Sequence, residues 1–494
     1  MTTGARSADA LFQAGLNCLS RRAWTQAAQA FAQTLAAQPK HMPALLTAGQ
    51  LALQMGDAAL AVSLLTRLIK LAPRHTDALN ARGAAQLALR EPALALLNFE
   101  KVAELQPRAD FAHANRGLAL LAMHRPADAL AAFDQALALR PDNAQSHGNR
   151  GNALSRLHRW DEAIAAFEAA LALQPDLHLA RWNIGMTQLR LGQWHSGWQH
   201  SEARLDLFAA QGWQAPSAAP RWATGMPLAG RRLLVHSEQG LGDTLQFGRF
   251  VPLLQAMGAQ VVFEVQAPLQ GLISAALPNT EVVARGQPLP PHDLQCPLMS
   301  LPLALCTDAS GLPPPLPVQP DAARLSHWQT RLGPRDRPRV GVVWSGNPQQ
   351  SDDIHRSIPL TTLLPALHPG IEWISLQQEV RPWDEAAMRS GHLQQVQQEQ
   401  QLRHFGSELQ SFDDTAALCA HMDLVVSVCT SVAHLAGSMG KPLWLLAAHT
   451  ADWRWLTERE DSPWYPGARI FRQAQAGDWS GVLHRVSAAL DGMR

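Results

Sequence analysis

Small and apolar residues recur at a fixed spacing through the first two-fifths of the chain. Glycine returns every 34 residues, at Gly15, Gly49, Gly83, Gly117, Gly151 and Gly185. Twelve positions after each of the first five glycines comes an alanine, at Ala27, Ala61, Ala95, Ala129 and Ala163. Four positions later comes a large apolar residue, at Phe31, Leu65, Phe99, Phe133 and Phe167. A proline closes each unit, at Pro39, Pro73, Pro107, Pro141 and Pro175.

Each of these positions has a mechanical reason. The small residues let paired helices approach closely, the large residue fills the gap between units, and proline ends the second helix because it cannot donate a backbone hydrogen bond. This spacing is typical of tetratricopeptide repeats, which are pairs of antiparallel helices. We predict an all-α solenoid over residues 8–205, with five full repeats and an atypical sixth. In the sixth, Gly197 and Trp198 replace the alanine, and we expect this terminal repeat to dock on the next part of the chain.

The solenoid predicts a protein or peptide partner. Stacked repeats form a concave surface that usually binds such ligands. We expect first-helix positions to line it, at Asn80, Asn115, Arg116, Asn149, Arg150 and Asn183. Asparagine suits hydrogen bonding to an extended peptide backbone, although the same residues also fit an ordinary solvated face. A spacer or an oligomerisation arm is the alternative role for the array.

The hydrophobic pattern changes in the second half. After a linker at 206–230, short apolar runs alternate with helical stretches, and they predict strands at 233–235, 258–265, 280–285, 339–344, 372–377, 423–428 and 441–446. Strands that alternate with helices favour a parallel sheet. A proline-rich segment at 311–320 separates two α/β lobes, at 231–320 and 338–476, and a helix is expected at 477–494. Ligands should bind at the carboxyl ends of the strands, in the cleft between the lobes.

Composition narrows the classes of function. The chain has 494 residues, of which 47% are apolar and 17% charged, and its 41 basic and 41 acidic residues give a formal net charge of +0. A balanced charge argues against a nucleic-acid or membrane-surface partner. We see no signal peptide and no run of about 18 apolar residues, so no transmembrane segment is expected. Five scattered cysteines without a CxxC pair indicate a reducing, cytoplasmic location.

Three loops that follow predicted strands carry candidate chemistry. In the first, Gly240 and Gly242 allow a tight turn and a close approach of backbone to ligand. Asp243 follows at the start of a helix. Its carboxylate suits either a helix N-cap or a general base, and the sequence leaves both open.

The second loop, at 342–360, has a turn at Gly346 and Asn347. Arg356 and Ser357 suit the binding of a diphosphate, with arginine as a two-pronged donor. The alternative is that Arg356 forms a salt bridge to Asp352 or Asp353 at the surface.

The third loop joins the predicted strand 423–428 to a helix. Thr430 and Ser431 stand at the helix start, where free N–H groups and the dipole favour an anion, and His434 lies one turn further on. A lone histidine on a helix is more often a core or surface residue. Ahead of that strand, Asp413 or Asp414 is expected to cap the preceding helix. The chain has no DxD, HExxH, CxxC or GxSxG, so we expect no metal site and no cofactor.

Several motifs occur in a specific order. They are GLGD at 240–243, WSGNP at 344–348, HRSIPL at 355–360, SLQ at 375–377, DDTAAL at 413–418, TSVAHLAGSMGKPLWLL at 430–446, DWRWL at 452–456 and DSPWYPGARIFRQ at 461–473. With the repeats, this set resembles bacterial repeat proteins fused to a GT-B glycosyltransferase unit. The unit is similar to lipopolysaccharide heptosyltransferases of glycosyltransferase family 9, and more distantly to repeat-bearing protein O-GlcNAc transferases.

The resemblance implies an inverting, metal-independent transfer of a hexosyl or heptosyl group from a nucleotide sugar to a protein or glycan. The first lobe would hold the acceptor at Gly240 and Gly242, and Asp243 would take the proton from its hydroxyl. The second lobe would bind the nucleotide sugar through Gly346, Asn347, Arg356, Ser357, Gln377, Asp414, Thr430, Ser431 and His434. Gln377 and Asp414 would border the base and ribose. The loop with Arg356 and Ser357 and the helix start at Thr430 would stabilise the diphosphate leaving group, and His434 would sit by the phosphates.

Two positions depart from the family pattern. Relatives commonly have Asp where Cys429 stands, and the loop usually written Asn-Asp-Arg here reads Asp352-Asp353-Ile354. We therefore expect a partly buried, non-catalytic Cys429 and a weakened or altered donor site, which Cys429→Asp should strengthen. The alternative function is a non-catalytic scaffold that carries a degenerate transferase domain.

Overall fold

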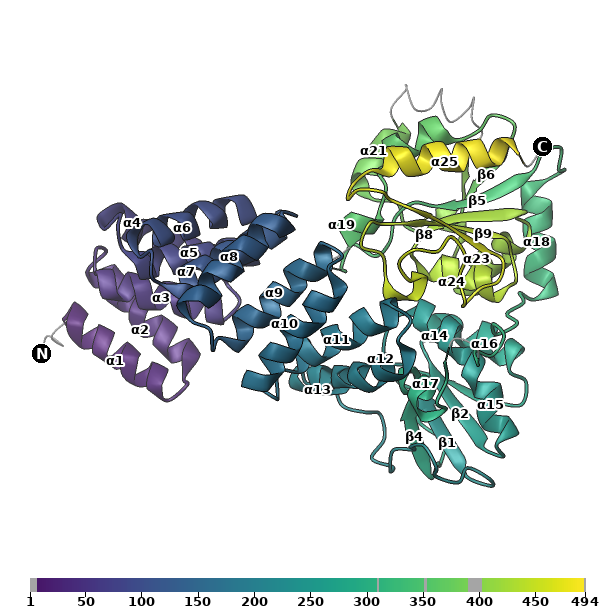
Figure 1. The fold of residues 1–494 in the computed structure, drawn as a ribbon, viewed down its shortest axis with the longest axis horizontal. Coiled ribbons are helices and arrows are strands. Elements are labelled where there is room, and N and C mark those ends of the chain that lie inside the picture. Colours follow the sequence, from purple (N-terminus) through teal and green to yellow (C-terminus); the bar gives the residue numbers. More distant parts are fainter. Residues whose placement is uncertain (1–6, 309–310, 351–352, 390–401, 493–494) are drawn as a thin grey trace, which may run out of the picture. The chain divides into compact units, whose positions relative to one another are not determined.

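The computed structural model describes residues 7–308, 311–350, 353–389 and 402–492. The chain divides into two compact units, Met1–Ile184 and Gly185–Arg494 (Figure 1). The limits predicted for the individual domains remain predictions.

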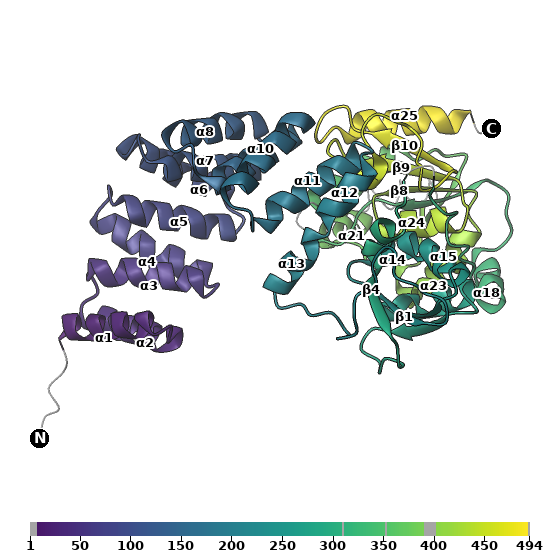
Figure 2. The ribbon, with the colours of Figure 1, turned by 60° about the horizontal axis from the view of Figure 1, so that its bottom comes forward.

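The first unit is all-helical, as the repeats predicted. Its helices are α1 (Ala8–Ser20), α2 (Trp24–Ala37), α3 (Met42–Gln54), α4 (Ala58–Leu71), α5 (Thr76–Ala88), α6 (Pro92–Leu105), α7 (Asp110–Ala122), α8 (Pro126–Leu139), α9 (Ala144–Arg156) and α10 (Trp160–Leu173), and α11 (His178–Arg190) begins in it. Figure 2 shows the successive helices stacked on one another. A Cβ atom added at Gly117 would lie 2.5 Å from the ring of Phe133. The repeat glycine is therefore required for the close approach of the paired helices.

The second unit begins inside α11 and contains the remaining helices of the atypical repeat, α12 (Trp194–Ser201) and α13 (Ala203–Ala210). Trp194 stacks on Trp464 with ring centroids 5.1 Å apart, and Trp198 meets Phe247 edge-on. All four side chains belong to the main hydrophobic core of this unit. This is the docking expected of the terminal repeat, since its tryptophans are buried against later parts of the chain.

Two parallel sheets form the rest of the second unit. The first has the order β3-β2-β1-β4, with β1 (Arg232–His236), β2 (Gln260–Val265), β3 (Glu281–Ala284) and β4 (Leu294–Pro297). The second has the order β10-β9-β8-β5-β6-β7, with β5 (Arg339–Val343), β6 (Glu372–Ser375), β7 (Leu402–His404), β8 (Leu424–Val428), β9 (Leu443–Ala447) and β10 (Ala468–Arg472). This arrangement is compatible with the predicted α/β class. Strands β4, β7 and β10 were not predicted, because their short runs show no clear periodicity.

Helices connect these strands. With the first sheet come α14 (Leu241–Phe247), α15 (Val251–Ala256), α16 (Gln270–Ala276) and α17 (Leu301–Ala304), and with the second α18 (Ala322–Leu332), α19 (Asp353–Arg356), α20 (Leu360–Leu363), α21 (Pro382–Arg389), α23 (Phe412–Ala420), α24 (Ser431–Ser438) and α25 (Trp479–Asp491). Short 3-10 turns are η1 (Gly248–Phe250), η2 (Ala267–Leu269), η3 (Leu298–Ser300), η4 (Leu364–Ala366), η5 (Gly406–Glu408) and η6 (Trp453–Trp455).

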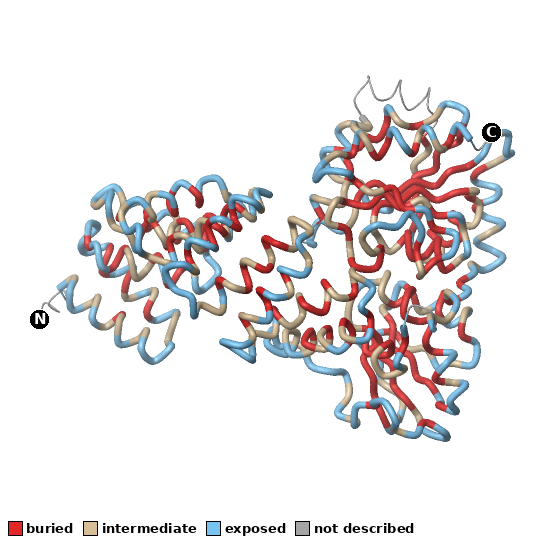
Figure 3. The backbone as a smooth tube through the Cα atoms, viewed as in Figure 1, coloured by how far each residue is buried: buried red, intermediate tan, exposed pale blue. Residues whose placement is uncertain are grey.

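The central strands of the second sheet are buried along their whole length, as Figure 3 shows in red. Parallel strands covered on both faces are expected to be continuously apolar. Val340 and Val342 of β5 share a core with α25, whose predicted apolar face is buried as expected, at Trp479, Val482, Leu483, Val486 and Leu490. Val343, on the other face of β5, belongs to the main core.

Candidate functional site

Helices α14 and α24 each begin just after a strand, and their first turns lie against each other. A Cβ atom at Gly242 would stand 2.7 Å from Cδ2 of His434 and 3.4 Å from the Cα of Ser431. Only a glycine at position 242 fits this contact without a shift of its neighbours. The structure therefore brings the first and third predicted loops together, although 189 positions separate Gly242 from Ser431 in the sequence.

Asp243 is the third residue of α14 and not its N-cap, which is Gly240. Its Oδ2 accepts a hydrogen bond from the backbone N–H of Gly240 at 2.8 Å, and its Oδ1 accepts from Nη2 of Arg454. The side chain is 18% exposed. Burial raises the pKa of Asp243 above the usual carboxyl value, and the charge of Arg454 opposes that rise. Asp243 thus supports the helix start and keeps some access to solvent.

Arg454, on η6, is the centre of a buried cluster of polar side chains. The cluster joins the loop and helix after β1 to the segment after β9. Its Nε donates to Gln246 Oε1 at 2.5 Å, and its Nη1 donates to Asp452 Oδ1 at 3.0 Å. Burial by itself would lower the pKa of Arg454, but the carboxylates of Asp452 and Asp243 raise it. Sequence reasoning assigned no role to Arg454, although it stands in the DWRWL motif.

Cys429 is partly buried, as predicted. Its Sγ accepts a hydrogen bond from the indole Nε1–H of Trp455 at 3.1 Å. Burial and the nearby carboxylate of Asp452 raise the pKa of the Cys429 thiol to about 11. The thiol is therefore protonated at neutral pH and is neither an anion nor a nucleophile there.

His434 lies inside the core, 5% exposed. Its ring stacks on Trp455 with centroids 5.6 Å apart, and its Nδ1 is 2.9 Å from the hydroxyl oxygen of Tyr465. Burial and the charge of Arg454 lower the pKa of His434 to about 3, so the imidazole is neutral at physiological pH. Thr430 and Ser431, one turn earlier, are partly exposed, and Thr430 is the N-cap of α24.

The second predicted loop is held by two arginines around one buried carboxylate. Asp353 is 2% exposed, and its Oδ1 accepts from Arg356 Nε at 3.1 Å while its Oδ2 accepts from Arg381 Nη2. The salt bridge that the sequence offered as the alternative for Arg356 is therefore present with Asp353, although this carboxylate is buried and not at the surface. Asp352 lies outside the described residues. Ser357 Oγ donates to the same carboxylate at 3.1 Å and accepts from the N–H of Gly346 at 3.1 Å. Arg381 was missed, because nothing in the sequence around 376–383 connected it to the loop at 344–357.

The arginine pair also reaches the start of α24. Arg356 Nη1 donates to the backbone carbonyl of Cys429 at 3.0 Å. A Cβ at Gly346 would lie 2.5 Å from Arg356 Nη2, so glycine is needed for the guanidinium to take this position. The second and third loops are thus in direct contact.

The other predicted site residues have structural contacts of their own. The side-chain amide of Gln377 is buried, accepts from the N–H groups of Trp344 and Ser345 at 3.3 Å and donates back to the carbonyl of Ser345 at 3.0 Å. Asn347 is exposed, and its side chain accepts from the N–H of Gln349. The side-chain amides of Gln377 and Asn347 therefore have hydrogen-bond partners within the protein.

Asp414 lies in the first turn of α23, but the helix cap expected at Asp413 or Asp414 is Ser411. The Ser411 hydroxyl accepts from the N–H of Asp414, and the Asp414 carboxylate accepts from the N–H of Ser411. A serine and an acid three residues apart satisfy each other's backbone groups in this way. Asp414 also pairs with Arg324 Nε at 3.2 Å.

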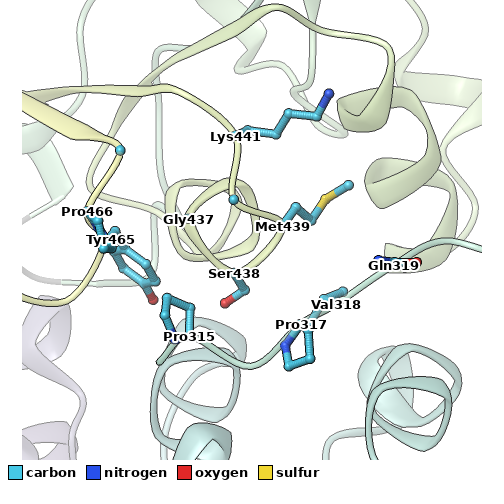
Figure 4. Close-up of a pocket in the computed structure, with 12 residues that line it drawn as sticks. Pro315, Pro317, Val318, Gln319, Gly437, Ser438, Met439, Lys441, Tyr465 and Pro466 are labelled. Carbon is cyan, nitrogen blue, oxygen red and sulfur yellow. The ribbon is translucent and has the colours of Figure 1, made fainter. Parts of the chain in front are cut away.

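A pocket lies at the other end of α24, and Figure 4 shows its walls. The proline-rich segment contributes Pro315 and Pro317, the end of α24 contributes Gly437 and Ser438, and Tyr465 closes one side. The predicted site residues are not among those that line it.

On the first helices of the repeats, several of the predicted surface residues hydrogen-bond to side chains of other repeat helices. Asn115 Nδ2 donates to Asn80 Oδ1 at 2.7 Å, and Arg150 Nε donates to Asp134 at 2.7 Å. Arg116 donates to Gln135 at 3.1 Å, and Asn183 to Asn152 at 2.9 Å. Asn149 is 6% exposed. These contacts connect helices within a repeat and in neighbouring repeats, and they leave fewer polar groups for a partner than the sequence suggested.

Neither a metal-binding cluster nor a membrane-spanning helix is found in the described part of the chain. The described residues hold no group of three or more His, Cys, Asp or Glu side chains placed to bind a metal ion. None of their helices combines the length and the apolar character needed to cross a bilayer.

Comparisons with known proteins identify the repeats. The family model described as tetratricopeptide repeat matches residues 46–110, 115–178 and 149–194. Protein FlbA of Caulobacter vibrioides is 30% identical over 320 residues, which are 60% of this chain and 52% of FlbA, so the chain spans about half the length of that relative. A MamA structure from Desulfovibrio magneticus RS-1 (22% identity, 35% of this chain, 98% of MamA) superposes with a TM-score of 0.33. A thermophilic TPR protein of Thermus thermophilus (22% identity, 37% of this chain, 100% of that chain) gives 0.32. The matched repeats indicate a scaffold for protein interaction.

Proposed function

We propose that the second unit is a GT-B glycosyltransferase of the family 9 type, inverting and metal-independent, that acts in the cytoplasm on a protein or glycan presented by the repeats. The observation that carries the proposal is the contact of Gly242 with Ser431 and His434. It places Asp243, from the loop after β1, beside the helix start after β8. An acid–base residue and an anion site at the carboxyl ends of two parallel sheets are the arrangement that such a transfer requires.

In this mechanism the acceptor hydroxyl attacks the anomeric carbon, the bond from that carbon to the diphosphate breaks, and the hydroxyl proton passes to Asp243. The Asp243 carboxylate has room for this proton. Each of its oxygens offers two acceptor positions, and each receives one hydrogen bond, from Gly240 and from Arg454. The raised pKa of Asp243 suits a general base, because it brings the carboxyl closer to working pH.

The leaving diphosphate would be stabilised by Arg356, Ser357 and the helix start at Thr430 and Ser431. Fixed donors aimed at a developing anion lower the barrier most where water is excluded. The neutral His434 would supply a hydrogen bond and no charge. Gly346 and Asn347 would border the phosphates, and Gln377 and Asp414 the base and ribose.

A non-catalytic scaffold with a degenerate transferase domain is the second candidate function. It is favoured by the ion pair of Asp243 with Arg454, which opposes the rise in the pKa of that carboxyl, and by the uncharged thiol of Cys429 in place of the family's aspartate.

Calorimetric titration with nucleoside diphosphates and nucleotide sugars separates the two functions. The transferase requires that at least one of them binds, and the absence of any binding contradicts it. If one binds, Asp243→Asn should abolish sugar transfer and leave donor affinity nearly unchanged. The matched control is Asp461→Asn, whose carboxylate is 64% exposed. Equal activity in Asp243→Asn and Asp461→Asn would remove Asp243 from the mechanism.

A further inference from the structure

Trp383 is an exposed aromatic ring beside the arginine pair. It is 59% exposed, whereas Trp344, which follows β5, and Trp373 of β6 are buried. It stands in the first turn of α21, which follows the loop after β6. The guanidinium carbon of Arg381 lies 5.3 Å from the centroid of the Trp383 ring. A large apolar ring left in water is informative, because burial of that ring by a ligand is favourable.

The start of α21 is fixed before any ligand binds. Asp384 is 2% exposed, its Oδ2 accepts from the indole Nε1–H of Trp344 at 3.0 Å, and its Oδ1 accepts from the N–H of Leu360 at 3.0 Å. Asp384 therefore ties α21 to the end of β5 and to α20. A ring presented from an anchored helix loses little conformational freedom when a ligand covers it.

Arg381 has binding capacity that the protein does not use. Its Nη2 donates to Asp353, to Ser357 Oγ at 3.1 Å and to the carbonyl of Gly346 at 3.4 Å. Its Nε is buried and has no hydrogen-bond partner in the described structure. The two guanidinium groups of Arg356 and Arg381 share the single carboxylate of Asp353, and the charge of Asp384 also acts on Arg381. Two neighbouring guanidinium groups and an unpaired N–H favour an anionic ligand.

We propose that Arg381 and Trp383 bind one ligand, a nucleoside diphosphate. Arg381 acts with Arg356 on the phosphate groups, and the Trp383 ring stacks on the base. The inference rests on the proposed function and adds two residues and a mode of base recognition to it. Only one residue separates Arg381 from Trp383 in the chain, so the ligand must carry a negative group close to a flat aromatic ring. Inorganic phosphate and a sugar phosphate both lack the aromatic ring.

The test compares two probes, inorganic pyrophosphate and the best binder among ADP, GDP, UDP and CDP, by calorimetry on the full chain. Trp383→Ala should lower the affinity for the nucleoside diphosphate by about tenfold or more, because the ring stacks on the base alone. It should leave the affinity for pyrophosphate unchanged. Arg381→Gln should weaken both probes. Arg459→Gln, which removes an exposed arginine elsewhere on this unit, should change neither.

The outcomes separate this inference from the proposed function. If the wild type binds neither a nucleoside diphosphate nor a nucleotide sugar, the proposed function fails, and this inference falls with it. If it binds a nucleotide sugar but no nucleoside diphosphate, this inference alone is wrong. If the wild type binds and Trp383→Ala binds equally well, the stacking is wrong while the proposed function stands. If Arg381→Gln keeps wild-type affinity for the nucleoside diphosphate, the role of Arg381 is wrong. If Arg381→Gln fails to fold because Asp353 loses a partner, Trp383→Ala still tests whether one ligand is bound at this site. Its substitution changes an exposed side chain and should leave the fold intact.

Discussion

Arg454 donates a hydrogen bond to the carboxylate of Asp243, although 211 residues separate them in the chain. Asp243 follows the first sheet's β1 and Arg454 the second sheet's β9, so this pair joins the loops of the two sheets. The Arg454 side chain is 8% exposed, and it also binds Asp452. A buried arginine between two carboxylates leaves both unpaired when it is removed.

We expect Arg454→Gln to destabilise the second unit by about 3–5 kcal/mol, the range for breaking a buried pair from one side. Urea denaturation followed by tryptophan fluorescence measures the loss. In the double variant with Asp243→Asn the loss should be smaller than the sum of the two single losses, because the residues interact directly. Arg459→Gln, which breaks an exposed pair with Asp461, should change stability by less than about 1 kcal/mol. Equal effects of Arg454→Gln and Arg459→Gln would show that the buried pair contributes nothing.

His434 predicts a loss of stability in acid. Its pKa is about 3 in the folded protein and about 6.5 in the unfolded chain. Between these values the unfolded state binds the proton, so the stability contributed by the neutral imidazole is complete above pH 6.5 and falls as the pH drops towards 3. The slope is at most about 1.4 kcal/mol per pH unit. His434→Gln should have a shallower dependence of the free energy of unfolding on pH, and the exposed His484→Gln should match the wild type. Parallel curves for all three proteins would contradict a depressed pKa.

The Cys429 thiol should be unreactive in the folded protein. The thiolate is the species that reacts with iodoacetamide, and the raised pKa of about 11 keeps Cys429 protonated at pH 8. Peptide mass spectrometry after a short treatment should find Cys306, which is exposed, alkylated and Cys429 intact. In urea both should react. Alkylation of Cys429 at the rate of Cys306 in the folded protein would contradict the raised pKa that burial and Asp452 give this thiol.

Two glycines on α9 should respond in opposite ways to the same change. A Cβ at Gly151 would lie 2.5 Å from the buried ring of Phe167, whereas a Cβ at Gly148 would meet only Leu177 at 3.8 Å. Gly151→Ala should therefore destabilise the first unit by about 1–3 kcal/mol through overpacking. Gly148→Ala should stabilise it by up to about 1 kcal/mol, because alanine is the better helix former. Circular dichroism of the thermal transition distinguishes the two, and similar shifts would contradict the Gly–Phe contact as the reason for the repeat glycine.

The sequence singled out three loops that follow predicted strands. In the structure these loops lie in contact, Gly242 with Ser431 and Arg356 with the carbonyl of Cys429. The sequence did not show which charged partners their side chains have, Arg454 for Asp243 and Arg381 beside Arg356 for Asp353. The end of a strand can be predicted from the periodic pattern of its residues. The ion-pair partner of a charged side chain depends instead on which distant loop lies beside it in the fold.

The sequence by itself determined the repeats and their internal contacts. A 34-residue period sets residues sixteen positions apart against each other, as with Gly151 and Phe167, and such contacts form within one helix pair. It also determined the apolar face of α25, since that face follows helical periodicity. Only the tertiary structure decided that α12 is buried with Trp464, that His434 is neutral within the core, and that Trp383 remains exposed beside Arg381. Burial and ionisation depend on neighbours far away in the chain, and the local order of residues does not specify those neighbours.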